Sequence, residues 1–311
     1  MAVFTKLTKE EITAHLAKYD LGELVAFEEI LAGIDNSNFI LHTKKGNFSG
    51  KFILTIFEKR IEAQDLPFFI NFKLHLVEKN IPVPAAIASL QGETLVDLKN
   101  KKSAIVTFLS GGEAKNIEAN HCFEVGKILA KMHLAALDFQ GVRQNDLGVK
   151  NWRNLFNKFQ HLLDSYQLGL KEEILQNLDF LESSWRFDLP ASAAHLDLFP
   201  DNVFFDEKNQ ACGAIDFYFA ANDLLIYDFA IAVVAWCDLE EKFLAIFNGY
   251  EEIKKFGENE KDFLKIALVG ACMRFLLTRL HDMFFTPKDS FVKIKDPQEY
   301  LHKLRFFKAN L

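Results

Sequence analysis

Residues that favour strands and residues that favour helices occupy different parts of this 311-residue chain. Runs rich in Phe, Ile and Leu at residues 27–33, 38–43 and 51–57 predict strands, and the KKGN sequence at 44–47 predicts a hairpin turn. Beyond residue 110 the apolar residues recur mainly at helical spacing. Strands followed by helices favour an α+β architecture over an alternating, doubly wound sheet.

Two helices are expected among these strands. A capping box formed by Thr8 and Glu11 begins the first, and the second covers residues 62–79. The Ile-Pro-Val-Pro sequence at 81–84 then prevents further helix, because each proline pushes its predecessor towards extended backbone. Further strands at residues 94–98 and 104–109 complete the expected antiparallel sheet.

The Ser-Gly-Gly sequence at 110–112 is interpreted as a hinge. We therefore predict two domains, a β-rich N-terminal lobe of residues 1–109 and a helical C-terminal lobe of residues 110–311. Helices of the second lobe are expected near residues 123–136, 152–165, 172–185, 224–236, 240–254 and 261–284.

Composition narrows the classes of function. The net charge of −7 argues against a nucleic-acid surface, because binding to phosphate backbones normally needs a basic face. The most apolar stretches, residues 224–236 and 266–277, are too short for a membrane span and carry Asp228 and Arg274. Four widely spaced cysteines are expected to be reduced, at positions 122, 212, 237 and 272. With no secretory signal at the N-terminus, we expect a cytoplasmic protein without a membrane partner.

The strongest functional signal is the sequence AHLDLFPDNVFF at residues 194–205, which contains His-x-Asp-x-x-x-x-Asn. A predicted turn at 206–210 and then Asp216 follow it. Phosphoryl transfer needs a carboxylate that deprotonates the attacking hydroxyl and oxygen ligands that hold Mg²⁺ against the phosphates. Asp197, Asn202 and Asp216 supply these groups. An Asp–Asn pair in a loop is also ordinary turn chemistry, so the pattern gains its weight from its context.

Several segments resemble the aminoglycoside phosphotransferase and choline kinase family. They are residues 33–39, 52–58, 66–69, 81–84, 195–205 and 215–220. The resemblance runs nearly from end to end, and residues 215–237 are particularly similar to the homoserine kinases of this family. It implies a two-lobed, protein-kinase-like fold, with ATP and Mg²⁺ as cofactors and the hydroxyl group of a small molecule as phosphate acceptor.

The resemblance also implies roles for individual residues. Asp197 corresponds to the catalytic base, and His195 shapes the loop that carries it. Asn202 and Asp216 correspond to the ligands of Mg²⁺, and Asp228 to an aspartate that accepts hydrogen bonds from the backbone of the catalytic loop.

The loop expected to cover the phosphates departs from the glycine-rich pattern of protein kinases, because Gly33 is the single glycine in residues 33–39. Backbone N–H groups and the side chains of Asn36, Ser37 and Asn38 are expected to replace the usual glycine-rich loop.

A lysine that pairs with the phosphates is expected on the strand 51–57, but Thr55 occupies its place. Lys51 lies on the same strand face and is one substitute, and Lys59 and Arg60 are others. The acidic partner of such a lysine is Glu62 or Asp65. For adenine we expect backbone groups of Thr107–Ser110, with Phe108 or Leu109 packing on the ring.

The preferred acceptor is homoserine, which carries an ammonium and a carboxylate group beside its hydroxyl. Asp223 and Arg274 are nominated to bind these charges, with Tyr218 lining the pocket, although Asp223 and Arg274 also suit structural ion pairs. Choline, ethanolamine, a sugar or an aminoglycoside remain alternative acceptors. A nucleotide-binding pseudokinase scaffold is the alternative from another class of function, and the sequence leaves both a monomer and a homodimer open.

Overall fold

The computed structural model describes residues 4–31, 36–58, 61–287 and 294–310. The chain forms two compact units, Met1–Gly111 with Cys212–Tyr218, and Gly112–Ala211 with Phe219–Leu311. We expected a single division after residue 109. In the structure the segment 212–218 also belongs to the first unit, because its backbone and side chains contact the proline-rich segment and the second helix of that unit.

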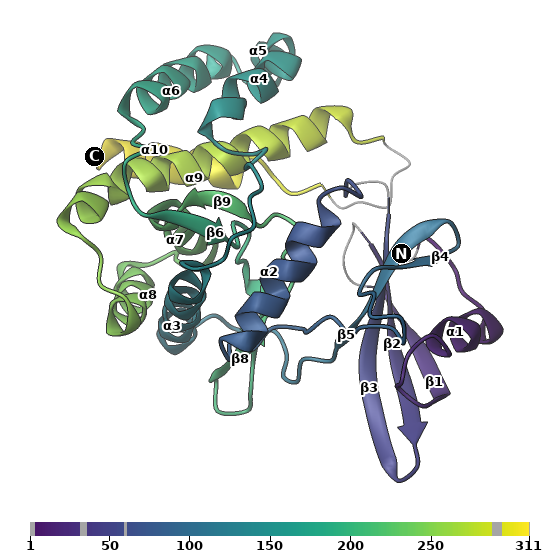
Figure 1. The fold of residues 1–311 in the computed structure, drawn as a ribbon. Helices are drawn as coiled ribbons and strands as arrows, with labels where there is room; N and C mark the ends of the chain where they lie inside the picture. Colours follow the sequence, from purple (N-terminus) through teal and green to yellow (C-terminus); the bar gives the residue numbers. More distant parts are fainter. Residues whose placement is uncertain (1–3, 32–35, 59–60, 288–293, 311) are drawn as a thin grey trace. The chain divides into compact units, whose positions relative to one another are not determined.

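The first unit contains a five-stranded antiparallel sheet (Figure 1). Its strands, in spatial order, are β1 (Glu23–Ile30), β2 (Asn36–Lys45), β3 (Phe48–Phe57), β5 (Lys101–Thr107) and β4 (Val96–Leu98). The predicted turn between β2 and β3 is confirmed, since Lys45 pairs with Phe48 and Gly46 adopts a positive φ of 60°.

Helices α1 (Lys9–Leu16) and α2 (Leu66–Glu78) accompany this sheet. The predicted capping box is present, because the Thr8 hydroxyl accepts a hydrogen bond from the Glu11 N–H and the Glu11 carboxylate accepts one from Thr8. Helix α2 begins four residues later than predicted, with Pro67 in its first turn, where a missing N–H costs no hydrogen bond. The core beneath the sheet includes Leu7, Ile12, Leu16, Tyr19, Phe39, Leu41, Leu54, Ile56, Val96 and Ile105.

The segment 212–218 is fixed to this unit by its backbone. Gly213 has a φ of 152°, and a Cβ atom on it would lie 2.1 Å from the Pro82 carbonyl oxygen. The next residue, Ala214, donates its N–H to the same carbonyl at 3.2 Å. The Phe217 ring packs edge-on against Phe72 of α2. Only a glycine fits so close to the Ile-Pro-Val-Pro segment.

The second unit is mainly helical, as predicted. Its helices are α3 (Ala119–Ala136), α4 (Val149–Phe159), the 3₁₀ turn η1 (Gln160–Leu162), α5 (Leu163–Tyr166), α6 (Leu170–Ser184), α7 (Leu225–Trp236), α8 (Glu240–Ile253), α9 (Glu258–Phe285) and α10 (Gln298–Ala309). Strands β6 (Ala191–Ala194) and β9 (Ala221–Leu224) pair antiparallel, and β7 (Val203–Phe205) precedes the turn that leads to β8 (Ala211–Ala214). Helix α10 and strand β9 were not predicted.

Helix α9 is the centre of this unit, with 28 residues and contacts to α4, α6, α7 and α10. Most of its middle third is buried, including Arg274, which is 2% exposed. In the part of the chain that is described, no helix combines the length and apolar character that crossing a bilayer requires.

Helices α3 and α8 cross at a pair of glycines. A Cβ atom on Gly126 would lie 2.1 Å from the Ile246 carbonyl oxygen, and one on Gly249 would lie 2.0 Å from the Phe123 carbonyl oxygen. Real Cβ atoms do not approach carbonyl oxygens so closely, so the two backbones touch only because both positions lack a side chain.

Candidate active site

The His-x-Asp-x-x-x-x-Asn motif begins where β6 ends. Leu196 is fully buried and has a positive φ of 60°, a left-handed conformation that is uncommon for a leucine. The residues on either side of it are His195 and Asp197. The Nδ1 atom of His195 accepts a hydrogen bond from the Asp197 N–H at 3.2 Å. The turn therefore presents Asp197, whose side chain is 19% exposed, from a buried and strained backbone.

The carboxylate of Asp228, on α7, holds this turn. It accepts hydrogen bonds from the backbone N–H of His195 at 3.0 Å and of Leu196 at 2.7 Å. The third partner is the Nε2 atom of His133, at 3.0 Å. Burial by itself would raise the pKa of Asp228, but the hydrogen bond and charge of His133 and the further backbone bond lower it overall. The buried carboxylate therefore stays ionised.

Arg274 contacts the same turn from α9. Its guanidinium donates a hydrogen bond to the Leu196 carbonyl, and its Nη2 atom lies 3.8 Å from an Asp197 carboxylate oxygen. The ring of Phe275 lies 4.8 Å from the guanidinium carbon. The carbonyl and the N–H of Leu196 are thus both bound by charged side chains, which compensates the left-handed conformation.

Asn202 closes the loop in the 3₁₀ turn η2 (Pro200–Asn202). Its Nδ2 atom donates to the Asp197 carbonyl at 2.8 Å, and its N–H donates to the Phe199 carbonyl at 2.9 Å. Because the amide nitrogen faces Asp197, the amide oxygen is the atom that Asn202 can offer to a cation. The turn predicted at residues 206–210 is confirmed, since Asp206 and Gln210 are joined by a hydrogen bond of 3.0 Å.

Asp216 belongs to the first unit. It is exposed and adopts a positive φ of 63°. The charged group that acts on it from α2 is Lys73, which is 4% exposed. Burial lowers the pKa of Lys73 to about 8, while the charge of Asp216 opposes this shift. Lys73 therefore remains mainly protonated at pH 7, although our sequence reasoning did not single it out.

Tyr218 follows Asp216 and packs edge-on against Phe57 of β3 and Phe69 of α2, with ring centroids 5.5 and 5.9 Å apart. Burial raises the pKa of Tyr218, and the Asp216 charge raises it further, while a hydrogen bond with Thr55 lowers it. Tyr218 is fixed to the sheet of the first unit.

The residues expected around the phosphates have defined partners in the sheet. Thr55 donates its hydroxyl hydrogen to the Asn38 side-chain oxygen at 2.8 Å. The Ser37 hydroxyl donates to the Glu58 carboxylate at 2.7 Å, and the Asn36 amide oxygen accepts from the Glu58 N–H at 3.4 Å. Gly33 lies outside the described residues. The amides and the Ser37 hydroxyl are thus tied to strand β3 and its end.

Lys51 lies beside the segment that we expected to bind adenine. The Nζ atom of Lys51 is 3.7 Å from the centre of the Phe108 ring. Thr107 exchanges hydrogen bonds with Ala85, through its N–H and its hydroxyl, at 2.9 Å each. Phe108 and Leu109 are half-buried. The expected site for adenine therefore follows a strand end fixed by side-chain and backbone bonds.

Asp223 has partners in the second unit that sequence reasoning did not identify. Its carboxylate accepts hydrogen bonds from Asn145 Nδ2 at 2.6 Å and from the Leu224 N–H at 2.7 Å. Burial raises its pKa, while the bonds from Asn145 and Leu224 and the charge of Arg274 lower it. Asp223 and Arg274 therefore interact electrostatically, but Arg274 makes its hydrogen bond with the loop at Leu196.

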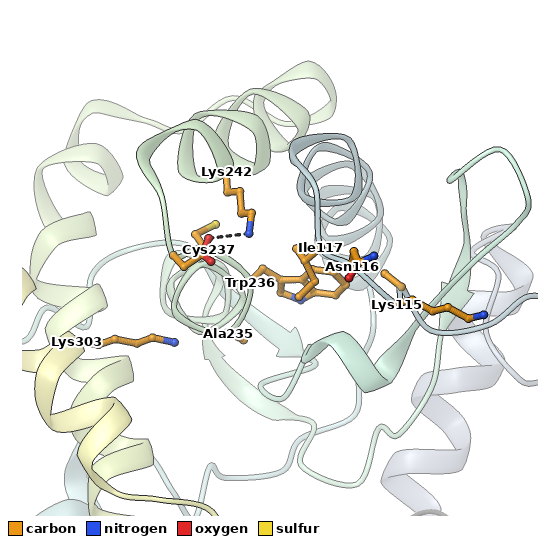
Figure 2. Close-up of a pocket in the computed structure, with 10 residues that line it drawn as sticks. Lys115, Asn116, Ile117, Ala235, Trp236, Cys237, Lys242 and Lys303 are labelled. Atoms are coloured by element: carbon orange, nitrogen blue, oxygen red, sulfur yellow. Dashed lines mark ion pairs between the residues drawn. The ribbon is translucent and has the colours of Figure 1, made fainter.

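A cavity of about 370 Å³ lies in the second unit. Its lining residues are Ala114, Lys115, Asn116, Ile117, Ala235, Trp236, Cys237, Asp238, Lys242 and Lys303, and neither Asp223 nor Arg274 is among them. Figure 2 shows Lys242 and Lys303 reaching towards the space beside Trp236 from two different helices. The Trp236 indole N–H donates to the Leu198 carbonyl at 2.8 Å, so the wall of the cavity is bonded to the residue that follows Asp197.

Known proteins resemble the chain over this whole arrangement. The model of the phosphotransferase enzyme family matches residues 26–263. The chain belongs to this family.

Two curated relatives of this phosphotransferase are named homoserine kinase. The one from Agrobacterium fabrum (strain C58 / ATCC 33970) is 43% identical over 99% of the chain and 96% of its own length. The one from Rhizobium meliloti (strain 1021) is 42% identical over 99% and 95%.

A solved spectinomycin phosphotransferase, in complex with ADP and spectinomycin, shares the fold of this phosphotransferase. It has a TM-score of 0.70 at 14% identity, with 98% of the chain and 95% of that structure covered. The predicted fold class is thus confirmed, with an antiparallel N-terminal sheet and a helical C-terminal region typical of kinase-like phosphotransferases.

Proposed function

We propose that this phosphotransferase transfers the γ-phosphoryl group of ATP to the hydroxyl of homoserine, giving O-phosphohomoserine. The observation that carries this proposal is the 42–43% identity to relatives named homoserine kinase over almost the full length of both chains. The Asp197 loop, buried and held by charged side chains, supports the same reaction. We place the protein in the cytoplasm, in line with its four free cysteines.

The proposed base is Asp197. Its carboxylate orients the acceptor hydroxyl and receives its proton as the new O–P bond forms. Asp228 positions the base indirectly, because its carboxylate accepts hydrogen bonds from the N–H groups of His195 and Leu196. Arg274 lies 3.8 Å from the Asp197 carboxylate, so its positive charge attracts and orients this carboxylate. His195 has the role of a packed loop residue.

Mg²⁺ is the proposed metal, and it would neutralise charge on the phosphates. The ligands would be the Asp216 carboxylate and the Asn202 amide oxygen. Both are hard oxygen donors of the kind that Mg²⁺ prefers, and it usually binds one or two protein groups together with substrate phosphates.

The nucleotide would be bound by the first unit, with adenine against Phe108 and Leu109 at the end of β5. Asn36, Ser37 and Asn38 are the first three residues of strand β2 and would place backbone N–H groups near the phosphates. Tyr218, bonded to Thr55, would hold the Asp216 segment against the sheet.

The cavity beside Trp236 is the proposed site for the charged groups of the acceptor, and its Trp236 wall is hydrogen-bonded to Leu198, next to the proposed base Asp197. Its lysines, Lys115, Lys242 and Lys303, suit the carboxylate of an amino acid, and Asp238 suits its ammonium group. Asp238 and Lys242 are 2.7 Å apart, so a zwitterion would exchange partners with an existing ion pair. Asp223, which does not line this cavity, remains an alternative group for binding the ammonium of the acceptor.

The test is phosphate transfer from ATP and Mg²⁺ to homoserine, choline, ethanolamine, a sugar and an aminoglycoside. Asp197→Asn and the matched control Asp201→Asn, four residues further along the same loop, are assayed in parallel. Selective turnover of homoserine that is lost only in Asp197→Asn supports the proposal. Selective turnover of another acceptor would discard the substrate, and ATP binding without turnover of any acceptor would favour a scaffold.

A further inference from the structure

Lys73 is an unusual residue for its position. It lies in α2, whose sequence LPFFINFKLHLVE is otherwise almost entirely apolar or neutral, and only 4% of it is exposed. Placing an ammonium group in such surroundings is costly unless a carboxylate compensates it. The compensating charge is that of Asp216, and the Tyr218 ring lies 5.6 Å from the Lys73 Nζ atom.

The same cluster contains the strand position that lacks the expected lysine. Thr55 hydrogen-bonds with Tyr218, and Tyr218 lies next to Lys73. Strand β3 thus contributes a neutral side chain where a positive charge is expected, while the helix beside it contributes a buried positive charge. Within this group of contacting residues, the positive charge is therefore on helix α2 and not on strand β3.

The other lysine that we considered has a different setting. Lys51 is exposed and lies over the Phe108 ring at 3.7 Å, at the far end of the strand from Phe57. It is suited to interact with the proposed adenine segment. Lys59 and Arg60 lie outside the described residues.

We propose that Lys73 is a positioning residue that replaces the missing strand lysine. Its buried ammonium group lies 5.6 Å from the centre of the Tyr218 ring, two residues after Asp216. It would hold the turn at Asp216, whose φ is 63°, in the conformation in which the Asp216 carboxylate binds the metal. It also adds the positive charge beneath the phosphates that Thr55 cannot supply. This inference rests on the proposed function, since it assigns Asp216 to metal binding.

The experiment compares wild type with Lys73→Met and Lys73→Gln. Lys102→Met is the matched control, because it removes a half-exposed lysine, paired with Asp97, from β5 of the same unit. Calorimetric titration measures the binding of ATP with Mg²⁺ and of adenosine, which has no phosphates. Steady-state kinetics give kcat/KM for ATP and the KM for homoserine. Urea unfolding followed by circular dichroism checks that each variant is folded.

We expect Lys73→Met to weaken the binding of ATP with Mg²⁺ and to lower kcat/KM for ATP by about tenfold or more. Adenosine binding and the KM for homoserine should change by less than about threefold, and Lys102→Met should resemble wild type. Stability should be unchanged or higher, because methionine removes the desolvation cost of the buried ammonium and the exposed Asp216 carboxylate stays hydrated.

Unchanged binding of ATP with Mg²⁺ in both Lys73 variants would overturn the proposal. So would an equal loss of adenosine and ATP binding, which indicates a general disturbance of the unit. The phosphorylation of homoserine by the wild type tests the proposed function separately. If wild type does not phosphorylate homoserine but the Lys73 variants still lose only phosphate-dependent binding, the acceptor is wrong and the role of Lys73 stands.

Discussion

Replacing Asp228 by asparagine should destabilise the second unit and slow phosphoryl transfer. The carboxylate accepts three hydrogen bonds, from His133 and from the N–H groups of His195 and Leu196, and asparagine has one amide oxygen to accept them. The amide NH₂ of asparagine would face at least one N–H donor. Hydrogen bonds to charged acceptors contribute about 1.5–3 kcal/mol each, so a loss of about 3–5 kcal/mol in the free energy of unfolding is expected.

The assay is urea unfolding followed by tryptophan fluorescence. All three tryptophans, at positions 152, 185 and 236, lie in the second unit, so the signal reports on that unit. The matched control is Asp238→Asn, an exposed carboxylate just beyond the same helix, which should cost no more than about 1 kcal/mol. In the variant at Asp228, kcat should fall at least about tenfold while the KM for ATP changes little, because the turn at Leu196 loses its support. A loss below about 1 kcal/mol would refute the reasoning that this carboxylate holds the turn.

Three further outcomes are expected. Arg274→Met should lower kcat at least about tenfold with little change in the KM for homoserine, whereas a selective rise in that KM would show that Arg274 binds the acceptor. Burial alone would raise the pKa of Glu58, but its hydrogen bonds with Lys101 and two hydroxyls lower it overall, so the folded state binds the proton less tightly than the unfolded state. The stability that Glu58 contributes is therefore present above the ordinary pKa of 4.5 and is lost as the pH falls through the lowered value. In urea unfolding monitored by circular dichroism, Glu58→Gln should be less stable than wild type at pH 7, and this difference in the free energy of unfolding should shrink in acid. Gly249→Ala should cost about 1–3 kcal/mol in tryptophan-monitored unfolding, because its Cβ would lie 2.0 Å from a carbonyl oxygen, while Gly112→Ala, which meets no atom within 4 Å, should cost little.

Sequence reasoning succeeded where the information is local. The division between sheet and helices follows from long periodic segments, and the Asp197–Asn202 spacing is short enough for one loop to present both groups. The capping box and the β2–β3 turn are likewise each determined by four consecutive residues. Strand β9 was missed because it has only four residues and is stabilised by pairing with β6, 30 residues earlier in the chain, as in Leu224 opposite Ala191.

The partners of charged residues could not be predicted, because they depend on tertiary contacts. Arg274 was nominated for the acceptor from its isolation in an apolar helix, yet its hydrogen bond goes to Leu196. The identical signal, a lysine within the apolar sequence of α2, was present at Lys73 and was overlooked. His133 and Asn145 belong to no sequence motif that we recognised. They contact Asp228 and Asp223, respectively, only in the folded chain.

The crossing of α3 and α8 constrains how the cavity beside Trp236 can change. One wall is the segment that enters α3, and another is the segment that enters α8, so both walls belong to helices whose backbones touch at Gly126 and Gly249. Helices in such contact cannot move closer, and moving them apart would break the tightest packing in the pair. The two glycines therefore fix the spacing of the two helices that follow these walls, so a change in the molecule bound there is expected to come from substitutions of lining side chains such as Lys242.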